Sequence, residues 1–151
     1  MVDVSKLDIS KFLPHRPPLL MVDKVLSIGD KHVSTSFQIK SDNVFVNNNL
    51  FSEVGLVECA AQTCSSIVGK SYFEDDDFEG TGTKLIGFIS TIKSVQLFAC
   101  AEVGATIKAC AKLVSRFDAD DYTICTLNCK ITDEEKELLS CELNLFIREV
   151  K

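Results

Sequence analysis

The sequence predicts an α+β fold in which an antiparallel sheet of about six strands wraps around one long central helix. Residues 54–69 form a largely apolar run of helical length with one charged residue. The segments before and after this run alternate apolar and polar residues with the two-residue period of strands. A helix that is apolar on every side must be covered on every side, so a curved sheet and a second subunit or neighbouring loops are both required.

Two strands are expected ahead of the helix. Residues 4–12 read as a short amphipathic turn, which a cluster of prolines ends. A first strand is expected over residues 19–28, closed by a turn at Gly29 and Asp30. Residues 32–39 alternate strictly, so this second strand has one dry face and pairs with the first as a hairpin. Residues 43–51, which hold three consecutive asparagines, are expected to form a loop.

The central helix is expected to run from about Val54 to Tyr72. Ser52 is expected to cap its first turn, where Glu53 also suits the positive end of the helix dipole. The acidic stretch 74–79 should then form an exposed connection.

Everything after that connection is strand-like. The expected strands lie within residues 85–98, 107–113, 122–131 and 141–147. The expected order is two strands, one buried helix and about four further antiparallel strands. This order is typical of a hot-dog fold, and we expect a single domain over residues 1–151. This arrangement predicts a homodimer or a dimer-based oligomer, because one sheet cannot cover the whole helix.

Composition and charge exclude several classes of function. The chain has 151 residues and a net charge of −6, so neither nucleic acid nor an anionic membrane is expected as a partner. No apolar run reaches the roughly 18 residues that a membrane span needs, and the first residues lack an apolar signal core. We expect a cytoplasmic protein.

Seven cysteines lie within the apolar segments and form no Cys-x-x-Cys pair. We expect them to be small buried side chains in a reducing compartment, with no metal and no cofactor. Cys59 and Cys64 lie on the predicted central helix, so a nucleophilic role for either stays open.

Glu58 is the only charged residue in the apolar run 54–69. Burying a carboxylate without a partner is costly, so such a group is neutralised, paired or given a task. Two interpretations stay open at this point. Glu58 either pairs with a cation at a subunit seam or acts as a catalytic acid or base.

Two motifs resemble those of the β-hydroxyacyl-acyl-carrier-protein dehydratases. Residues 13–25 read LPHRPPLLMVDKV, which resembles the family's Leu-Pro-His-Arg opening and the strand after it. Residues 56–62 read LVECAAQ, which resembles its helix motif Leu-Glu-x-x-Ala-Gln. The resemblance spans nearly the whole chain. It implies that Glu58 is the catalytic acid and that Gln62, one turn later, orients the carboxylate or the helix packing.

The chain departs from this family just ahead of the helix. The family's catalytic base is a histidine in a Gly-His-Phe-Pro loop, but residues 45–52 contain no histidine. We expect Asn48 or Asn49 to turn toward Glu58 over the mouth of an acyl tunnel, where an amide can polarise a thioester carbonyl. The family's carbonyl-binding glycine corresponds to Glu53, and Gly55 replaces it only with a shift.

The closer likeness is to a divergent branch of hot-dog dehydratase-like proteins from aryl-polyene and related pigment pathways, in which a similar Asn-Leu segment precedes the helix. By resemblance, His15 belongs to the opening motif and has a structural role. His32 alternates outward on its strand and is expected to be solvated.

The leading hypothesis is a dehydratase-like lyase of 3-hydroxyacyl thioesters bound to acyl carrier protein or coenzyme A, working without the family's histidine. Two alternatives stay open: a hot-dog thioesterase, and a non-catalytic subunit that binds the acyl carrier. Carrier proteins are acidic, so docking requires a basic patch on this acidic chain. Its candidate residues are Lys84, Lys93, Lys108, Lys112 and Arg116.

Overall fold

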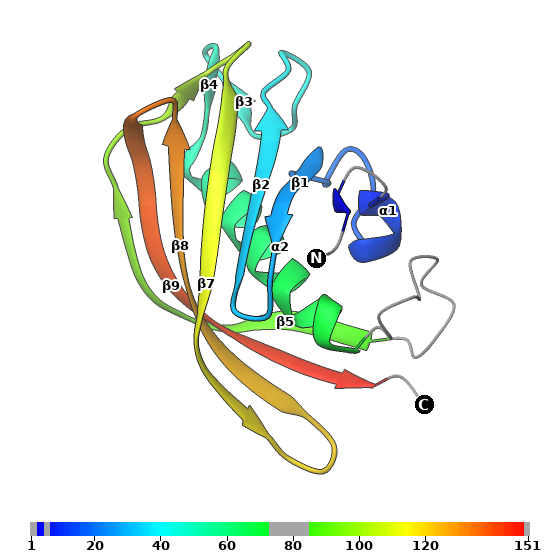
Figure 1. Cartoon of the computed structure of the whole chain (residues 1–151). Coiled ribbons are helices and arrows are strands. Elements are labelled where there is room, and N and C mark those ends of the chain that lie inside the picture. The colour runs from blue at the N-terminus through cyan, green and yellow to red at the C-terminus, as the bar shows by residue number, and fades with distance from the viewer. Residues whose placement is uncertain (1–2, 5–6, 73–84, 150–151) are drawn as a thin grey trace.

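A long helix lies in the curve of a six-stranded antiparallel sheet (Figure 1). The computed structural model describes residues 3–4, 7–72 and 85–149. The helix is α2 (Glu53–Tyr72), and the sheet has the order β1-β2-β7-β8-β9-β5. Its strands are β1 (Lys24–Ile28), β2 (His32–Gln38), β5 (Leu85–Leu97), β7 (Thr106–Asp118), β8 (Thr123–Asp133) and β9 (Lys136–Glu149). This architecture confirms the predicted fold class.

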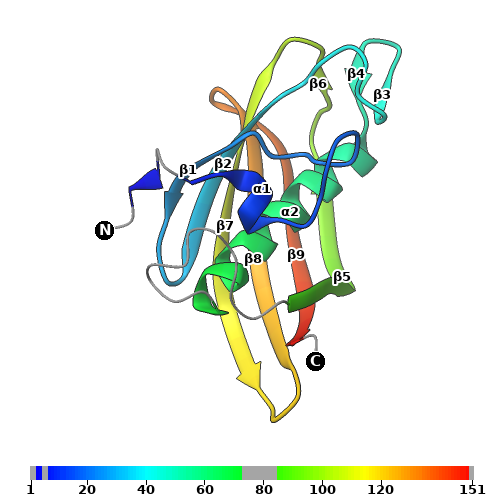
Figure 2. The same cartoon turned by 90° about the vertical axis from the view of Figure 1, so that its right-hand side faces the viewer.

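The start of α2 is fixed by the cap that the sequence predicts. The Gly55 amide donates to Ser52 Oγ at 3.3 Å, and the Leu56 amide donates to the Ser52 carbonyl at 3.1 Å. The Glu53 carboxylate lies in the first turn, at the positive end of the helix dipole. The short helix α1 (Ile9–Phe12) lies beside α2 on the side away from the sheet (Figure 2).

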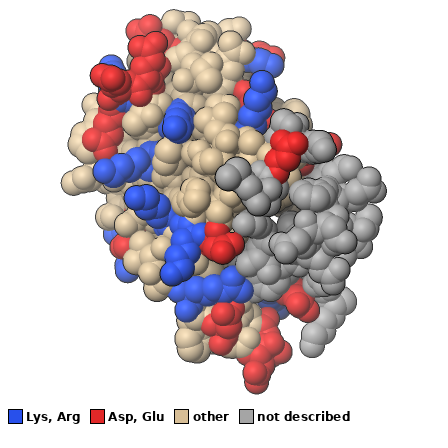
Figure 3. All heavy atoms as spheres, in the orientation of Figure 1, with Lys and Arg blue, Asp and Glu red and all other residues tan. Residues whose placement is uncertain are grey.

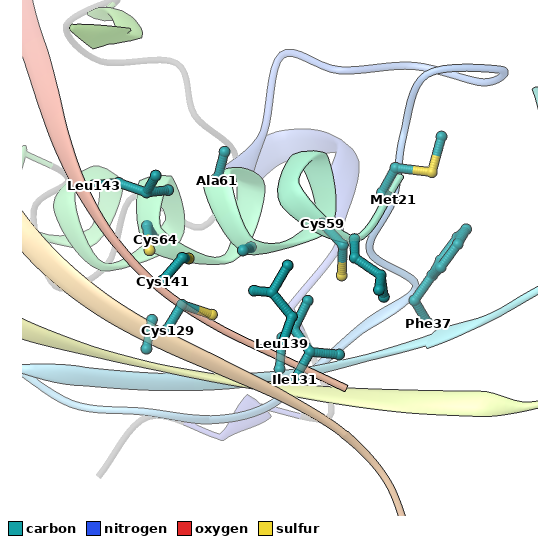
Figure 4. Close-up of a cluster of buried hydrophobic side chains, with 14 of the residues drawn as sticks. Met21, Phe37, Cys59, Ala61, Cys64, Cys129, Ile131, Leu139, Cys141 and Leu143 are labelled. Atoms are coloured by element: carbon teal, nitrogen blue, oxygen red, sulfur yellow. The ribbon is translucent and has the colours of Figure 1, made fainter. Parts of the chain in front are cut away.

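The core fills the space between α2 and the sheet with apolar and sulfur-containing side chains (Figure 4). Five of the seven cysteines are buried: Cys59, Cys64, Cys125, Cys129 and Cys141. Burial raises the pKa of the Cys59 thiol, and it raises the pKa of the Cys141 thiol to about 12. Both therefore stay protonated at neutral pH, and the geometry gives Cys59 a packing role rather than that of a nucleophile.

The first strand is shorter than predicted. It begins at Lys24 instead of residue 19. The Leu19 carbonyl and the Met21 amide are hydrogen-bonded to the Gln62 side chain on α2, so these backbone groups are not available to a strand partner. The segment before β1 is thereby attached to the helix.

The predicted asparagine loop contains two short strands. β3 (Val46–Asn47) and β4 (Leu50–Phe51) form a hairpin, to which β6 (Ala101–Glu102) adds a third strand. Asn48 and Asn49 form its turn with φ of 51° and 62°. Asparagine tolerates this left-handed region better than most residues, which explains how two in succession make the turn.

The helix is less enclosed than its sequence suggests. The Val54 side chain is 58% exposed, and the Glu58 side chain is 33% exposed in the single chain. The sheet covers one side of α2 and the N-terminal segment covers part of the other.

Three further expectations concern the cysteines, the acidic stretch and membrane spans. Cys110 is exposed, not buried, because it occupies an outward position of β7 between Ala109 and Ala111, which both face the core. The acidic stretch 74–79 lies outside the described residues. Among the described helices, none is both long and apolar enough to cross a membrane.

The thiols should differ sharply in reactivity. Brief treatment of the folded protein with iodoacetamide at neutral pH should label Cys110 first, because it is the exposed cysteine. In urea all seven cysteines should be labelled. Mass spectrometry of tryptic peptides gives the order of labelling. Early labelling of Cys59 or Cys64 in the folded protein would contradict the packing role of these residues.

Candidate active site

Glu58 lies on the side of α2 that faces the N-terminal segment. Its carboxylate has two polar neighbours among the described residues, Gln62 on the next turn and His15 on that segment. A third of the side chain remains exposed, so the carboxylate is reachable from outside the chain. Gln62 is thus a partner that the resemblance implied, whereas His15 is one that it did not.

Gln62 holds the Glu58 carboxylate in place. Its Nε2 donates to Glu58 Oε1 and to the Leu19 carbonyl, each at 2.9 Å. Its Oε1 accepts a hydrogen bond from the Met21 amide at 2.7 Å. The side chain is only 1% exposed. Both ends of the amide are therefore paired, and flipping the amide would break all three bonds.

His15 is the neighbour of Glu58 that the sequence analysis missed. Its Nε2 lies 3.7 Å from Glu58 Oε1, and its side chain is 31% exposed. Arg16 shapes the turn that carries it, because Arg16 Nη1 donates to the carbonyls of Leu13 and His15, each at 2.8 Å. The available signal was the scarcity of the residue type, because the chain has two histidines and the other, His32, alternates outward on its strand.

The structure does not bring the two asparagines to Glu58. Asn48 and Asn49 are exposed at the turn between β3 and β4, and within the described part of the chain neither has a hydrogen bond to Glu58. The Asn49 carbonyl instead accepts a hydrogen bond from the Val103 amide at 3.1 Å. Within the described residues, the hairpin turn therefore gives neither asparagine a hydrogen bond to Glu58.

Gly55 makes a close packing contact. A Cβ atom at this position would lie 2.6 Å from the Phe51 ring and 2.9 Å from Phe45 Cβ, so only glycine fits without a shift. Its amide already donates to Ser52 Oγ. These contacts account for Gly55 through the packing of the hairpin on the helix, and its amide is engaged in the helix cap.

The candidate docking lysines are only partly available. Lys84 lies outside the described residues, whereas Lys93 is paired with Glu142 and Arg116 with Asp118. Lys108 and Lys112 are exposed on the outer face of β7. Basic side chains spread over the middle and lower part of the face seen in Figure 3, with acidic ones toward its upper left and its lower end.

A carboxyl group and an imidazole side by side can donate and accept protons at neighbouring atoms. Gln62 holds the carboxyl group, and Arg16 shapes the turn that carries the imidazole. The arrangement therefore suits a reaction that adds water to a substrate or removes water from it.

Comparison with solved structures supports the fold. The dehydratase heterocomplex ApeI:P from Xenorhabdus doucetiae contains a similar chain, with a TM-score of 0.74 and 18% identity over 96% of this chain and 92% of that one. A hypothetical thioesterase with coenzyme A from Streptococcus pneumoniae TIGR4 has a TM-score of 0.61 and 12% identity, covering 85% and 87%. These likenesses confirm the predicted hot-dog fold.

One curated relative also matches in sequence. The 3-hydroxyacyl-[acyl-carrier-protein] dehydratase FabZ of Streptococcus uberis is 34% identical over 68 residues. The match covers 42% of this chain and 47% of that protein, so it spans about half the length of the relative.

The family model gives the broadest match. The model described as ApeP-like, ApeP dehydratase, matches residues 7–150, which include the segment of His15 and the whole of α2. The chain therefore belongs to the ApeP-like dehydratase family.

Proposed function

We propose that this protein is a lyase that interconverts 3-hydroxyacyl and 2-enoyl thioesters, with Glu58 as an acid/base group. The observation that carries the proposal is the Glu58 carboxylate, held by Gln62 on the central helix and still one-third exposed. Dehydration requires an acid that protonates the departing hydroxyl group. Membership of the ApeP-like dehydratase family supports the same reaction class.

The thioester carrier is proposed from the relatives. The name of the FabZ relative specifies an acyl carrier protein, and the thioesterase structure holds coenzyme A. Both carriers present the acyl chain through a thioester, so we propose an acyl-carrier-protein thioester as the substrate and a coenzyme A thioester as its practical substitute. A substrate-binding role for Asn48, Asn49 and Gly55 stays a prediction.

A thioesterase is the second candidate, because the similarity in fold includes a hypothetical thioesterase. An acidic residue on the central helix also serves hydrolysis, where it activates water or attacks the thioester. The two reactions differ in product. Dehydration keeps the thioester and forms a conjugated double bond, whereas hydrolysis releases a free thiol.

We further propose that β5 joins this chain to a second subunit, edge to edge. β5 pairs only with β9 in the described sheet, which leaves one long edge open. Large apolar side chains are exposed on and just after it: Phe88, Ile92, Val95, Leu97 and Phe98. Long apolar edges favour pairing with another chain. A second copy is the proposed partner, and a related dehydratase subunit, as in the ApeI:P heterocomplex, is the alternative.

Replacing the carboxyl group should abolish turnover and spare the fold. Glu58→Gln keeps the size of the side chain but removes the group that donates the proton. We expect loss of interconversion between 3-hydroxybutyryl- and crotonyl-coenzyme A, followed by absorbance of the conjugated product, with an unchanged circular dichroism spectrum. A variant with wild-type activity would refute Glu58 as the acid. Release of free thiol by the wild type, without enoyl product, would favour the thioesterase.

Removing the Gln62 amide should cost stability as well as activity. Gln62→Leu leaves the buried Met21 amide without its partner, at a cost of about 1–3 kcal/mol, and also removes the donor to the Leu19 carbonyl. The matched control is Ser65→Ala, which removes a bond to the Ala61 carbonyl within the same helix. Urea denaturation measures both. Equal free energies of unfolding for the two variants would contradict the bridging role of Gln62.

A charge on the open edge should weaken subunit association. Val95→Lys places a lysine on β5, where it opposes strand pairing. Val114→Lys is the control, because Val114 is also exposed but lies on β7. Sedimentation at micromolar concentration should give a dimer for the wild type and the control, and a smaller species for Val95→Lys. A stable wild-type monomer would rule out the homodimer.

A further inference from the structure

We infer that His15 is the general base of this reaction and takes the place of the loop histidine that the chain lacks. The inference rests on the proposed lyase function and adds a catalytic residue to it. It replaces the structural role that resemblance alone gives to His15. Four features of the structure support it.

The first feature is the distance between the two groups. His15 Nε2 lies 3.7 Å from Glu58 Oε1. Dehydration removes a proton from one carbon and a hydroxyl group from its bonded neighbour, so an acid and a base acting from one side must themselves be neighbours. A base must also come within about 3 Å of the atom that gives up the proton. A pair at this separation meets the first condition, and both side chains are about one-third exposed and so open to a substrate.

The second feature is the absence of structural hydrogen bonds to the imidazole ring. His15 Nδ1 is buried and has no hydrogen-bond partner among the described residues. The bonds of Arg16 go to backbone carbonyls, one of them that of His15, and not to its ring. A buried polar atom without a partner calls for an explanation in terms of strain, function or bound solvent. A role in packing alone would not explain why the imidazole ring faces Glu58.

The third feature is the rigid support of the segment. Leu13 and Met21, on either side of His15, are 2% and 0% exposed, so both anchor the backbone in the core. The Leu13 amide donates to the Ile9 carbonyl at 2.9 Å, which joins the segment to α1. The bonds of Gln62 fix its other end to α2. The imidazole and the carboxylate are therefore positioned by the same side chain.

The fourth feature is the lack of a better candidate base. Asn48 and Asn49 carry amides, which do not take up protons, and they lie at an exposed turn. His32 lies on β2, exposed, with its ring over Gly29. Cys59 is buried with a raised pKa. Among the described residues, His15 is the imidazole that lies beside Glu58.

The proton balance closes within the pair. Neutral His15 takes the α proton of the 3-hydroxyacyl thioester at Nε2, and the electron pair of that bond forms the double bond between the α and β carbons. The carbon–oxygen bond at the β carbon breaks, and the hydroxyl group leaves as water with the proton of the Glu58 carboxyl group. The site then holds an imidazolium and a carboxylate. Transfer of the proton from His15 to Glu58 restores the starting state.

The test compares His15→Ala with His32→Ala, which removes the other histidine of the chain. Loss of a general base typically lowers the rate ~10²–10⁴-fold, so we expect that loss for His15→Ala and none for His32→Ala. Free imidazole should restore part of the activity of His15→Ala, because the side chain it replaces is 31% exposed. The substrate is 3-hydroxybutyryl-coenzyme A, unlabelled or deuterated at the α carbon.

The isotope effect separates a catalytic from a structural role. When the base is removed, α-proton abstraction should limit the rate, so the deuterium effect on kcat should rise in His15→Ala. His15→Gln, which retains a polar side chain, guards against loss of folding and should show the same rise. A loss of activity without imidazole rescue and without a changed isotope effect would overturn the inference. Full activity of His15→Ala alongside an inactive Glu58→Gln would also overturn it and leave the proposed function standing. A wild type that converts neither thioester would overturn both.

Discussion

The side-chain amide of Gln62 is the interaction on which the candidate site depends. It joins two parts of the chain that are 41 to 43 residues apart, through the Met21 amide and the Leu19 carbonyl. The same amide donates to Glu58. Because an amide is both donor and acceptor, one residue can satisfy a backbone carbonyl, a backbone amide and a carboxylate together. Neither a glutamate nor a lysine at this position could do so.

The position of His15 follows from that bridge. Without the hydrogen bonds of Gln62, the residues before Lys24 would be free to extend β1. His15 would then lie elsewhere. With these bonds, the segment crosses α2 and returns toward the sheet, which places His15 beside the second turn of the helix. The hydrogen bonds between Gln62 and the backbone thus determine which side chain lies beside the carboxylate.

The sheet imposes the second constraint. It curls around one side of α2 and leaves the Val54 side chain of the first turn and the outer edge of β5 exposed. The side chains between the helix and the sheet are mostly apolar. Thr35 and Thr63 share one buried hydrogen bond of 2.8 Å across the helix–sheet contact, and the buried thiols serve as small apolar side chains. The Glu58 carboxylate and its two polar neighbours lie on the side of the helix that the sheet does not cover.

Local patterns predicted the secondary structure well. The period of two identified β2, β7, β8 and β9, and the apolar run with Ser52 ahead of it identified α2 with its cap. These features depend on residues close in sequence, whose periodicity reflects burial on one face. The expectation that Cys110 is buried rested on residue type and was wrong, because residue type does not reveal which face of a strand a side chain occupies.

The sequence by itself determined the hot-dog architecture and singled out Glu58 as a charge in an apolar helix. Only the tertiary structure decided that His15 is its neighbour and that Asn48 and Asn49 form a hairpin turn instead. The physical reason is that both outcomes depend on contacts between distant segments. Periodicity records which face of an element is buried, but it carries no information about which remote side chain meets that face.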